Sequence, residues 1–212
     1  CLSDSSAKGS LTLVVGDADS GANGLNLTLA SNSNTTLVPN ANVKLGGSGA
    51  NRTLTVTAAA KKSGTALLTL RVGDGLNTTD LPVTVIVGTD KNETLNGTAN
   101  TDMIFGLLGA NTINGLGGSD LLCGGSDVDS ISGDEGDDML YGGRGNDRMA
   151  GGPGADFFSG GPGTDTATDF TASQEDSQDG TVENTTPGAT GETGDTGEPQ
   201  IVNRLFLPAV QN

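Results

Sequence analysis

Short runs of alternating apolar and polar residues recur along the first 87 residues of the chain. Leu11–Val15, Leu25–Leu29 and Leu81–Val87 are examples, and β-branched residues are frequent in them. Two-residue alternation bounded by Gly, Asn, Asp or Pro predicts strands rather than helices. The turn signals lie roughly ten residues apart, which favours an antiparallel sandwich of about seven strands. We expect residues 1–87 to form this domain.

A second periodicity, of nine residues, begins at residue 88 and continues to residue 168. The sixth position is acidic in every repeat except one, where it is Asn111, and the eighth position is apolar from Leu95 to Ala167. The first position is always glycine, at residues 88, 97, 106, 115, 124, 133, 142, 151 and 160. Three columns of different chemistry in register indicate a repeat architecture rather than a solvated linker.

Composition narrows the chemistry of these segments. The chain has 26 acidic and 10 basic residues and no histidine, for a formal net charge of −16. This charge disfavours nucleic acid or an anionic membrane as a partner. The absence of histidine excludes Ser-His-Asp and Cys-His nucleophiles and histidine-based zinc sites. Residues 88–168 hold thirteen acids and three bases, whereas residues 1–87 hold five acids and six bases. An acidic repeat suits a hard cation with oxygen ligands.

The best-formed repeats are GGRGNDRMA, GGPGADFFS and GGPGTDTAT. They resemble the RTX (repeat-in-toxin) nonapeptide GGxGxDxUx, in which U is a large apolar residue. The resemblance covers residues 88–170 and implies a parallel β-roll, in which each nonapeptide forms one turn and one short strand and two repeats complete a coil. The fold class is therefore expected to be all-β.

The N-terminal segment has a second, less specific resemblance. SNTTLVPNANVKLGGSGANRTLTVT and SGTALLTLRVGDGLNTTDLPVTVIVG are similar to the Ig-like or cadherin-like modules of bacterial surface proteins. Such modules act as spacers or adhesive units. Asp17 and Asp19 resemble a cadherin-type calcium ligand pair, but an acidic turn between two strands is the favoured interpretation.

Calcium is the expected cofactor of the roll. One inward apolar residue in nine offsets little of the entropy lost on ordering a glycine-rich chain, and the acidic column repels itself. A cation between successive loops of one edge reverses that balance, and binding becomes folding free energy. Four gaps on one edge and three on the other allow up to seven Ca²⁺ sites. The best sites are expected between residues 115 and 165.

The candidate ligands are carboxylates, one amide and backbone carbonyls of the loops. The first loop, which ends at Glu93, and the third, which ends at neutral Asn111, depart from the pattern and predict weaker sites. The full set of candidate metal ligands is Asp102, Asp120, Asp129, Asp138, Asp147, Asp156 and Asp165, with Asn111, Gly115, Gly117, Gly124, Ser126, Gly133, Glu135, Gly142, Arg144, Gly151 and Pro153.

Beyond the repeat, residues 171–200 are rich in Thr, Gly, Asp and Glu, which predicts an acidic linker. Residues 201–212 form an apolar segment, expected as a strand docked on one of the two domains or donated to another molecule. Cys1 followed by polar residues resembles the start of a mature bacterial lipoprotein, so a lipid anchor at Cys1 and an arbitrary chain boundary are both open. A disulfide between Cys1 and Cys123 is not expected, and Cys123 lacks a neighbouring base to make it a nucleophile.

These observations favour a secreted or cell-surface, calcium-binding protein of structural or adhesive type, bacterial and not an enzyme, whose roll folds on extracellular calcium. The alternative is the non-catalytic C-terminal export or stabilising region of a larger secreted hydrolase. A glycosidase-like carboxylate pair is disfavoured because the repeat accounts for nearly all aspartates of the roll. The expected partners are calcium ions, other surface proteins or a second copy, with no nucleic acid and no membrane span.

Overall fold

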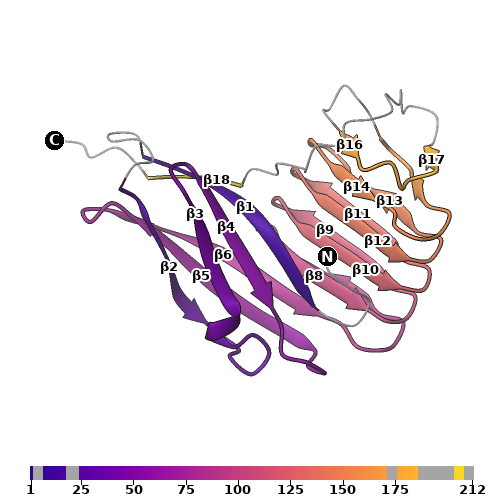
Figure 1. The fold of residues 1–212 in the computed structure, drawn as a ribbon, viewed down its shortest axis with the longest axis horizontal. Helices are drawn as coiled ribbons and strands as arrows, with labels where there is room; N and C mark the ends of the chain where they lie inside the picture. Colours follow the sequence, from indigo (N-terminus) through magenta and orange to yellow (C-terminus); the bar gives the residue numbers. More distant parts are fainter. Residues whose placement is uncertain (2–6, 18–23, 171–175, 186–202, 208–212) are drawn as a thin grey trace.

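The computed structural model describes residues 1, 7–17, 24–170, 176–185 and 203–207. Its regular elements are strands, apart from one short 3-10 turn, η1 (Asn40–Asn42), within this described part. The strands form two packed sheets at the N-terminal end and a coil of short parallel strands at the other (Figure 1). The all-β fold class predicted from the sequence is confirmed.

The N-terminal sheets face each other across an apolar core. One sheet has the order β18-β1-β4-β3 and the other contains β2, β5 and β6, with antiparallel pairing of β2 to β5 and β5 to β6. The strands are β1 (Lys8–Asp17), β2 (Asn26–Asn32), β3 (Val43–Ser48), β4 (Asn51–Thr57), β5 (Gly64–Gly73), β6 (Thr78–Val87) and β18 (Asn203–Leu207).

The predicted alternation places one side of each strand in this core. Leu68 and Leu70 of β5 are fully buried, whereas Leu67 and Arg71, which flank them in the sequence, are exposed. Leu11 of β1 and Leu54 of β4 pack against them from the opposite sheet. The likeness to Ig-like or cadherin-like modules stays a prediction, and Asp19 lies outside the described residues.

The terminal strand β18 pairs in parallel with β1, with Leu13 opposite Asn203 and Asp17 opposite Leu207. An apolar strand from the C-terminal end therefore adds a seventh strand to the six formed by residues 8–87. This arrangement agrees with a docked strand, one of the two alternatives. Residues 201, 202 and 208–212 lie outside the description.

The repeat forms a parallel solenoid with two walls. Strands 18 residues apart are neighbours, so that Leu122 pairs with Ile104 on one side and with Leu140 on the other. This register confirms two repeats per coil. One wall consists of β8 (Asp102–Leu107), β10 (Leu121–Ser126), β12 (Met139–Arg144), β14 (Phe157–Ser159) and β16 (Ser177–Gln178). The other consists of β7 (Thr94–Asn96), β9 (Thr112–Gly117), β11 (Ser130–Glu135), β13 (Arg148–Ala150), β15 (Thr166–Ala167) and β17 (Asn184–Thr185).

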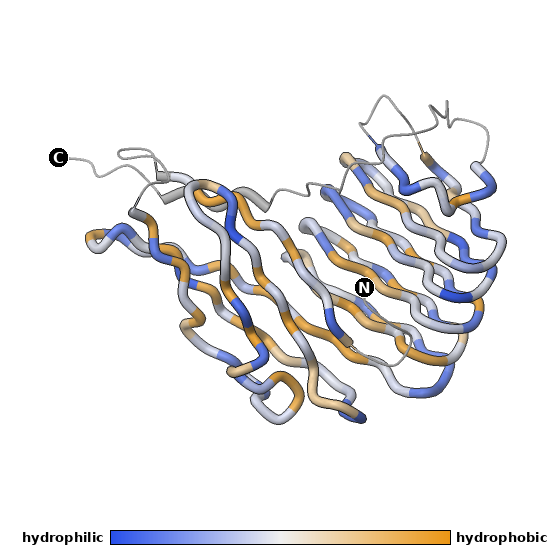
Figure 2. Tube along the Cα trace, viewed as in Figure 1, coloured by the Kyte–Doolittle hydropathy of each residue, from blue (hydrophilic) through white to orange (hydrophobic). Residues whose placement is uncertain are grey.

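The eighth repeat positions fill the interior of the roll. Ile104, Ile113, Leu122, Ile131, Leu140, Met149, Phe158 and Ala167 form one buried cluster. Phe170 and Val182 close its far end, where the Phe158 and Phe170 rings lie 5.9 Å apart. Apolar positions follow the strands, whereas hydrophilic positions are frequent on the connecting loops (Figure 2).

The roll extends beyond both predicted boundaries. At its start, β6 pairs in parallel with β8, and Ile86 packs into the roll interior, so one eight-stranded sheet runs through both parts. At its end, β16 and β17 continue the two walls. Residues 176–185, expected in the acidic linker, therefore belong to the solenoid. The rest of that predicted linker lies outside the described residues.

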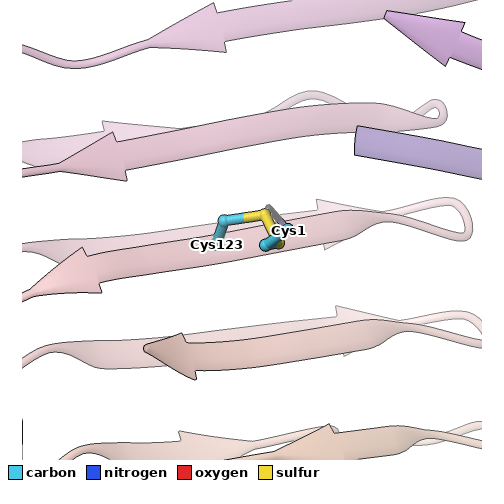
Figure 3. Close-up of a disulfide and its surroundings, with 2 residues drawn as sticks. All are labelled: Cys1 and Cys123. Atoms are coloured by element: carbon cyan, nitrogen blue, oxygen red, sulfur yellow. A yellow bond between two sulfur atoms is a disulfide. The ribbon is translucent and has the colours of Figure 1, made fainter. Parts of the chain in front are cut away.

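The expectation that Cys1 stays apart from the roll is wrong. Cys1 and Cys123 form a disulfide with a Cα–Cα separation of 6.0 Å (Figure 3). The chain comes within reach because β1 begins over the roll, where Gly9 packs directly against Leu121 and Phe105. A sulfur bonded to Cys123 cannot also carry a thioether lipid, so the disulfide removes the chemical basis for a lipid anchor at Cys1. No helix among the described residues is long and apolar enough to cross a membrane.

Candidate metal centre

The loops of the roll stack along two edges, and the loops from the third onward contain residues with positive φ. Gly143 and Gly145 have φ values of +106° and +145°, in the region that favours glycine. A Cβ on Gly143 would collide with the carbonyl oxygen of Gly125 in the preceding coil. Glycines at these positions therefore allow successive loops to approach closely. Four loop positions adopt positive φ without glycine, namely Leu107, Leu116, Asp127 and Asp134.

Every sixth-position aspartate is buried. All seven, from Asp102 to Asp165, are at most 2% exposed. In six of them, the Oδ1 atom accepts the backbone N–H of the residue 18 positions earlier, at 2.7–2.9 Å. Asp147 Oδ1, for example, accepts from the N–H of Asp129. One carboxylate oxygen thus joins each coil to the coil before it. The six are Asp120, Asp129, Asp138, Asp147, Asp156 and Asp165.

The second carboxylate oxygen of the same six aspartates is buried without a hydrogen-bond partner. Asp147 Oδ2 lies beside Gly142, at a point also flanked by the carbonyl oxygen of Gly160 from the next coil. The Gly160 carbonyl accepts the N–H of Gly143. A buried Oδ2 atom that lacks a donor is nevertheless unfavourable beside another oxygen, unless a cation or a proton lies with them. No group of three or more acidic or Cys side chains gathers in the described residues. The backbone carbonyls beside each Oδ2 atom are the further oxygens that the loops offer a metal.

Burial makes these carboxylates hard to ionise. Desolvation, assisted by neighbouring aspartates, raises the pKa of Asp120 to about 9 and that of Asp156 to about 8. The pKa values of Asp129 and Asp138 rise to about 7 and that of Asp147 to about 6, again mainly through desolvation. A bound cation would offset this desolvation cost.

Comparison with known protein families matches the repeat segment of the roll to one family. Residues 87–122, 96–131, 123–158 and 132–167 each match the family model of the RTX calcium-binding nonapeptide repeat. The family model thus finds four RTX repeats within residues 87–167. Repeats of this family bind Ca²⁺, and the resemblance seen in the sequence is confirmed for the roll. No curated protein and no solved structure matches the chain.

The predicted ligands of the RTX roll fall into two groups. The first-position residues Gly115, Gly124, Gly133, Gly142 and Gly151 lie directly beside the Oδ2 atom of the aspartate of their own loop. The third-position residues Gly117, Ser126, Glu135, Arg144 and Pro153 are half-buried or exposed, so only their backbone carbonyls are relevant. The Pro153 carbonyl already accepts the N–H of Gly136 at 3.0 Å and keeps a second lone pair.

The first three loops of the RTX roll differ from the rest. Glu93 Oε2 accepts the N–H of Thr89 at 2.6 Å, and Asp102 Oδ2 accepts the N–H of Thr98 at 2.5 Å. The Asn111 Nδ2 group donates to the carbonyl of Gly109 at 2.9 Å. None of the three side chains has a buried oxygen or nitrogen without a partner.

Three acidic residues after the last matched repeat continue the pattern, and the sequence analysis missed them. Glu183 Oε2 accepts the N–H of Asp165 at 2.6 Å, and Asp176 Oδ1 accepts the N–H of Asp156 at 3.0 Å. Asp169 accepts the N–H groups of Gly151 and Gly152. The 18-residue spacing from Asp165 to Glu183 was a usable signal. The spacing to Asp176 is 20 residues, which hides it from a strict repeat count.

Proposed function

We propose that this protein is an extracellular structural module whose RTX roll becomes ordered when it binds Ca²⁺. The observation that carries the proposal is the column of six buried aspartates, each with one oxygen that lacks a partner. Without a cation these groups destabilise the stacked loops, and with one they hold the loops together. Calcium binding and folding are then a single equilibrium.

The ligands that we assign are the Oδ2 atoms of Asp120, Asp129, Asp138, Asp147, Asp156 and Asp165. Backbone carbonyls of adjacent loops complete each site, with the first and third loop positions as the nearest candidates. An all-oxygen set on flexible glycine loops fits Ca²⁺, which accepts six to eight oxygens in variable geometry. Magnesium is smaller and demands a stricter octahedron, so this set suits it less well.

The usual calcium affinity of extracellular modules and one feature of this chain support an extracellular setting. Sites of extracellular modules bind calcium at roughly 10⁻⁴–10⁻³ M, far above the free calcium of a cytosol. The Cys1–Cys123 disulfide suits an oxidising compartment, where such bonds form and persist. The chain would thus reach its ordered form only after leaving the cell.

The test compares the full chain in chelator and in millimolar calcium by hydrogen exchange and circular dichroism. We expect residues 121–167 to exchange quickly in chelator and to become protected as calcium is added. The N-terminal strands β1 and β5 serve as an internal control, because they contain none of these sites. Full protection of residues 121–167 in chelator would contradict the proposal.

A further inference from the structure

The third loop of the RTX roll, residues 106–111, contains the single uncharged member of the sixth-position column. Asn111 is 2% exposed and occupies the same place as the aspartates. Its Oδ1 atom accepts the N–H of Glu93 at 3.0 Å, as the Oδ1 of each of the six aspartates from Asp120 to Asp165 accepts an N–H from the coil before it. For this hydrogen bond to the preceding coil, asparagine and aspartate are therefore interchangeable.

The other atom of the Asn111 amide group differs chemically from the second carboxylate oxygen of an aspartate. Because the Glu93 N–H is a donor, the amide atom that faces it must be the oxygen, and the NH₂ group faces the loop. This group donates to the carbonyls of Gly109 at 2.9 Å and Leu108 at 3.3 Å. Two carbonyls of the loop thus receive hydrogen atoms from the protein itself.

The fifth loop, residues 124–129, provides the direct comparison. Beside Gly124 lie Asp129 Oδ2 and the carbonyl oxygen of Gly142. Beside Gly106 lie Asn111 Nδ2 and the carbonyl oxygen of Gly124. The same point of the fold is flanked by two acceptors in one loop and by a donor and an acceptor in the other. Only the fifth loop has an orphaned oxygen there.

We propose that the Asn111 amide takes the place of a calcium ion in the third loop. Glu93 and Asp102 close the first two loops in a related way, through the N–H groups of Thr89 and Thr98. Calcium-dependent loops begin at Asp120, and the first three loops stay closed without metal against the sheet that contains β6. This inference rests on the calcium binding proposed above and replaces the expectation that Asn111 is a metal ligand.

The decisive variant is Asn111→Asp, which exchanges the donor for an oxygen without changing the shape of the side chain. We expect the variant to bind about one more Ca²⁺ per chain than the wild type in equilibrium dialysis of the full chain. In chelator, residues 102–117 should exchange faster than in the wild type. Asn92→Asp is the matched control, because it adds the same charge to an exposed loop position and its Oδ1 can still accept the Ala110 N–H. We expect it to leave the stoichiometry unchanged.

The reverse variant, Asp129→Asn, tests the same idea if Asn111→Asp fails to fold. Its amide should close the fifth loop, so that bound calcium falls by about one ion and the loop gains protection in chelator. Unchanged stoichiometry in both variants, with calcium still bound by the wild type, would overturn this inference alone. A wild type that binds no calcium would instead overturn the proposed function.

Discussion

At the residue scale, the roll depends on single backbone and carboxylate atoms whose surroundings leave little room for substitution. Glycines at positive φ bring backbones together where a Cβ has no room. Each of the six aspartates from Asp120 to Asp165 joins one coil through Oδ1, while its Oδ2 stays without a donor. The exchange of one oxygen for an NH₂ group at Asn111 changes what the loop requires. Small substitutions in these loops should therefore have large effects.

Gly143→Ala should destabilise the calcium-loaded protein by roughly 2–4 kcal/mol, because it combines an unfavourable φ with a collision against the Gly125 carbonyl. Gly75→Ala is the matched control, since Gly75 has a similar φ of +95° but open space around it. We expect that change to cost about 1 kcal/mol. Urea unfolding in saturating calcium measures both. Equal losses would show that the close approach of the loops is unimportant.

At the scale of elements, the 18-residue register turns separate side chains into a column. Desolvation raises the pKa values of these aspartates, and neighbouring aspartates raise them further. The same register gives the two walls of the roll different outer residues. The outer positions beside Ile104 and Leu122 are apolar, including Met103, Phe105 and Leu121, and they join the core of the N-terminal sheets. The corresponding positions on the other wall include Thr112 and Ser130, which are exposed.

The raised pKa values of the sixth-position aspartates should make the metal-free roll more stable at acidic pH. Five of these aspartates have folded pKa values from about 6 for Asp147 to about 9 for Asp120, above the ordinary value of 3.8. The folded metal-free state thus holds protons that the unfolded chain releases, and its stability declines as pH rises through this window. Circular dichroism in chelator at acidic and alkaline pH should show the loss. A metal-free roll that gains structure as pH rises would contradict the assignment.

Calcium should show the opposite dependence on pH, because it binds the ionised carboxylates. We expect its affinity to rise across the same window and its binding to release protons. Calorimetry in buffers of different ionisation enthalpy measures that release.

At the scale of the whole molecule, the two parts are joined by more than the chain. One sheet runs from β2 through β6 into the roll, and the Cys1–Cys123 disulfide ties the start of the chain to β10. The N-terminal sheets cover the apolar outer face of the first coils. The first coils of the roll therefore pack against a folded surface.

Reduction of the disulfide should lower the free energy of unfolding in calcium by about 2–5 kcal/mol, because the bond closes a loop of more than one hundred residues in the unfolded chain. The number of bound calcium ions should stay the same, since Cys123 lies on a wall of the roll and not in a loop. The double variant Cys1→Ser with Cys123→Ser should reproduce the effect without reductant. An unchanged unfolding midpoint after reduction would refute this role.

Much of the fold and of the candidate site could be predicted from the sequence. The glycine, acidic and apolar columns predicted the loops, the aspartates and the inward residues, because each column repeats one local requirement. The coil formed by Asp176 and Glu183 was missed because Asp169 replaces the next first-position glycine and two residues are inserted before Asp176. The apolar outer wall was missed because it repeats every 18 residues rather than every nine.

The sequence by itself determined the all-β class, the nine-residue repeat and its calcium chemistry, since these depend on local backbone freedom and on charge. Tertiary structure alone decided which oxygens are left without a donor. Asp102 and Asp120 share a column, yet only Asp120 has an orphaned Oδ2, because Thr98 donates to the first and no such group reaches the second. It also decided that Cys1 meets Cys123, because that contact depends on how β1 lies across the roll.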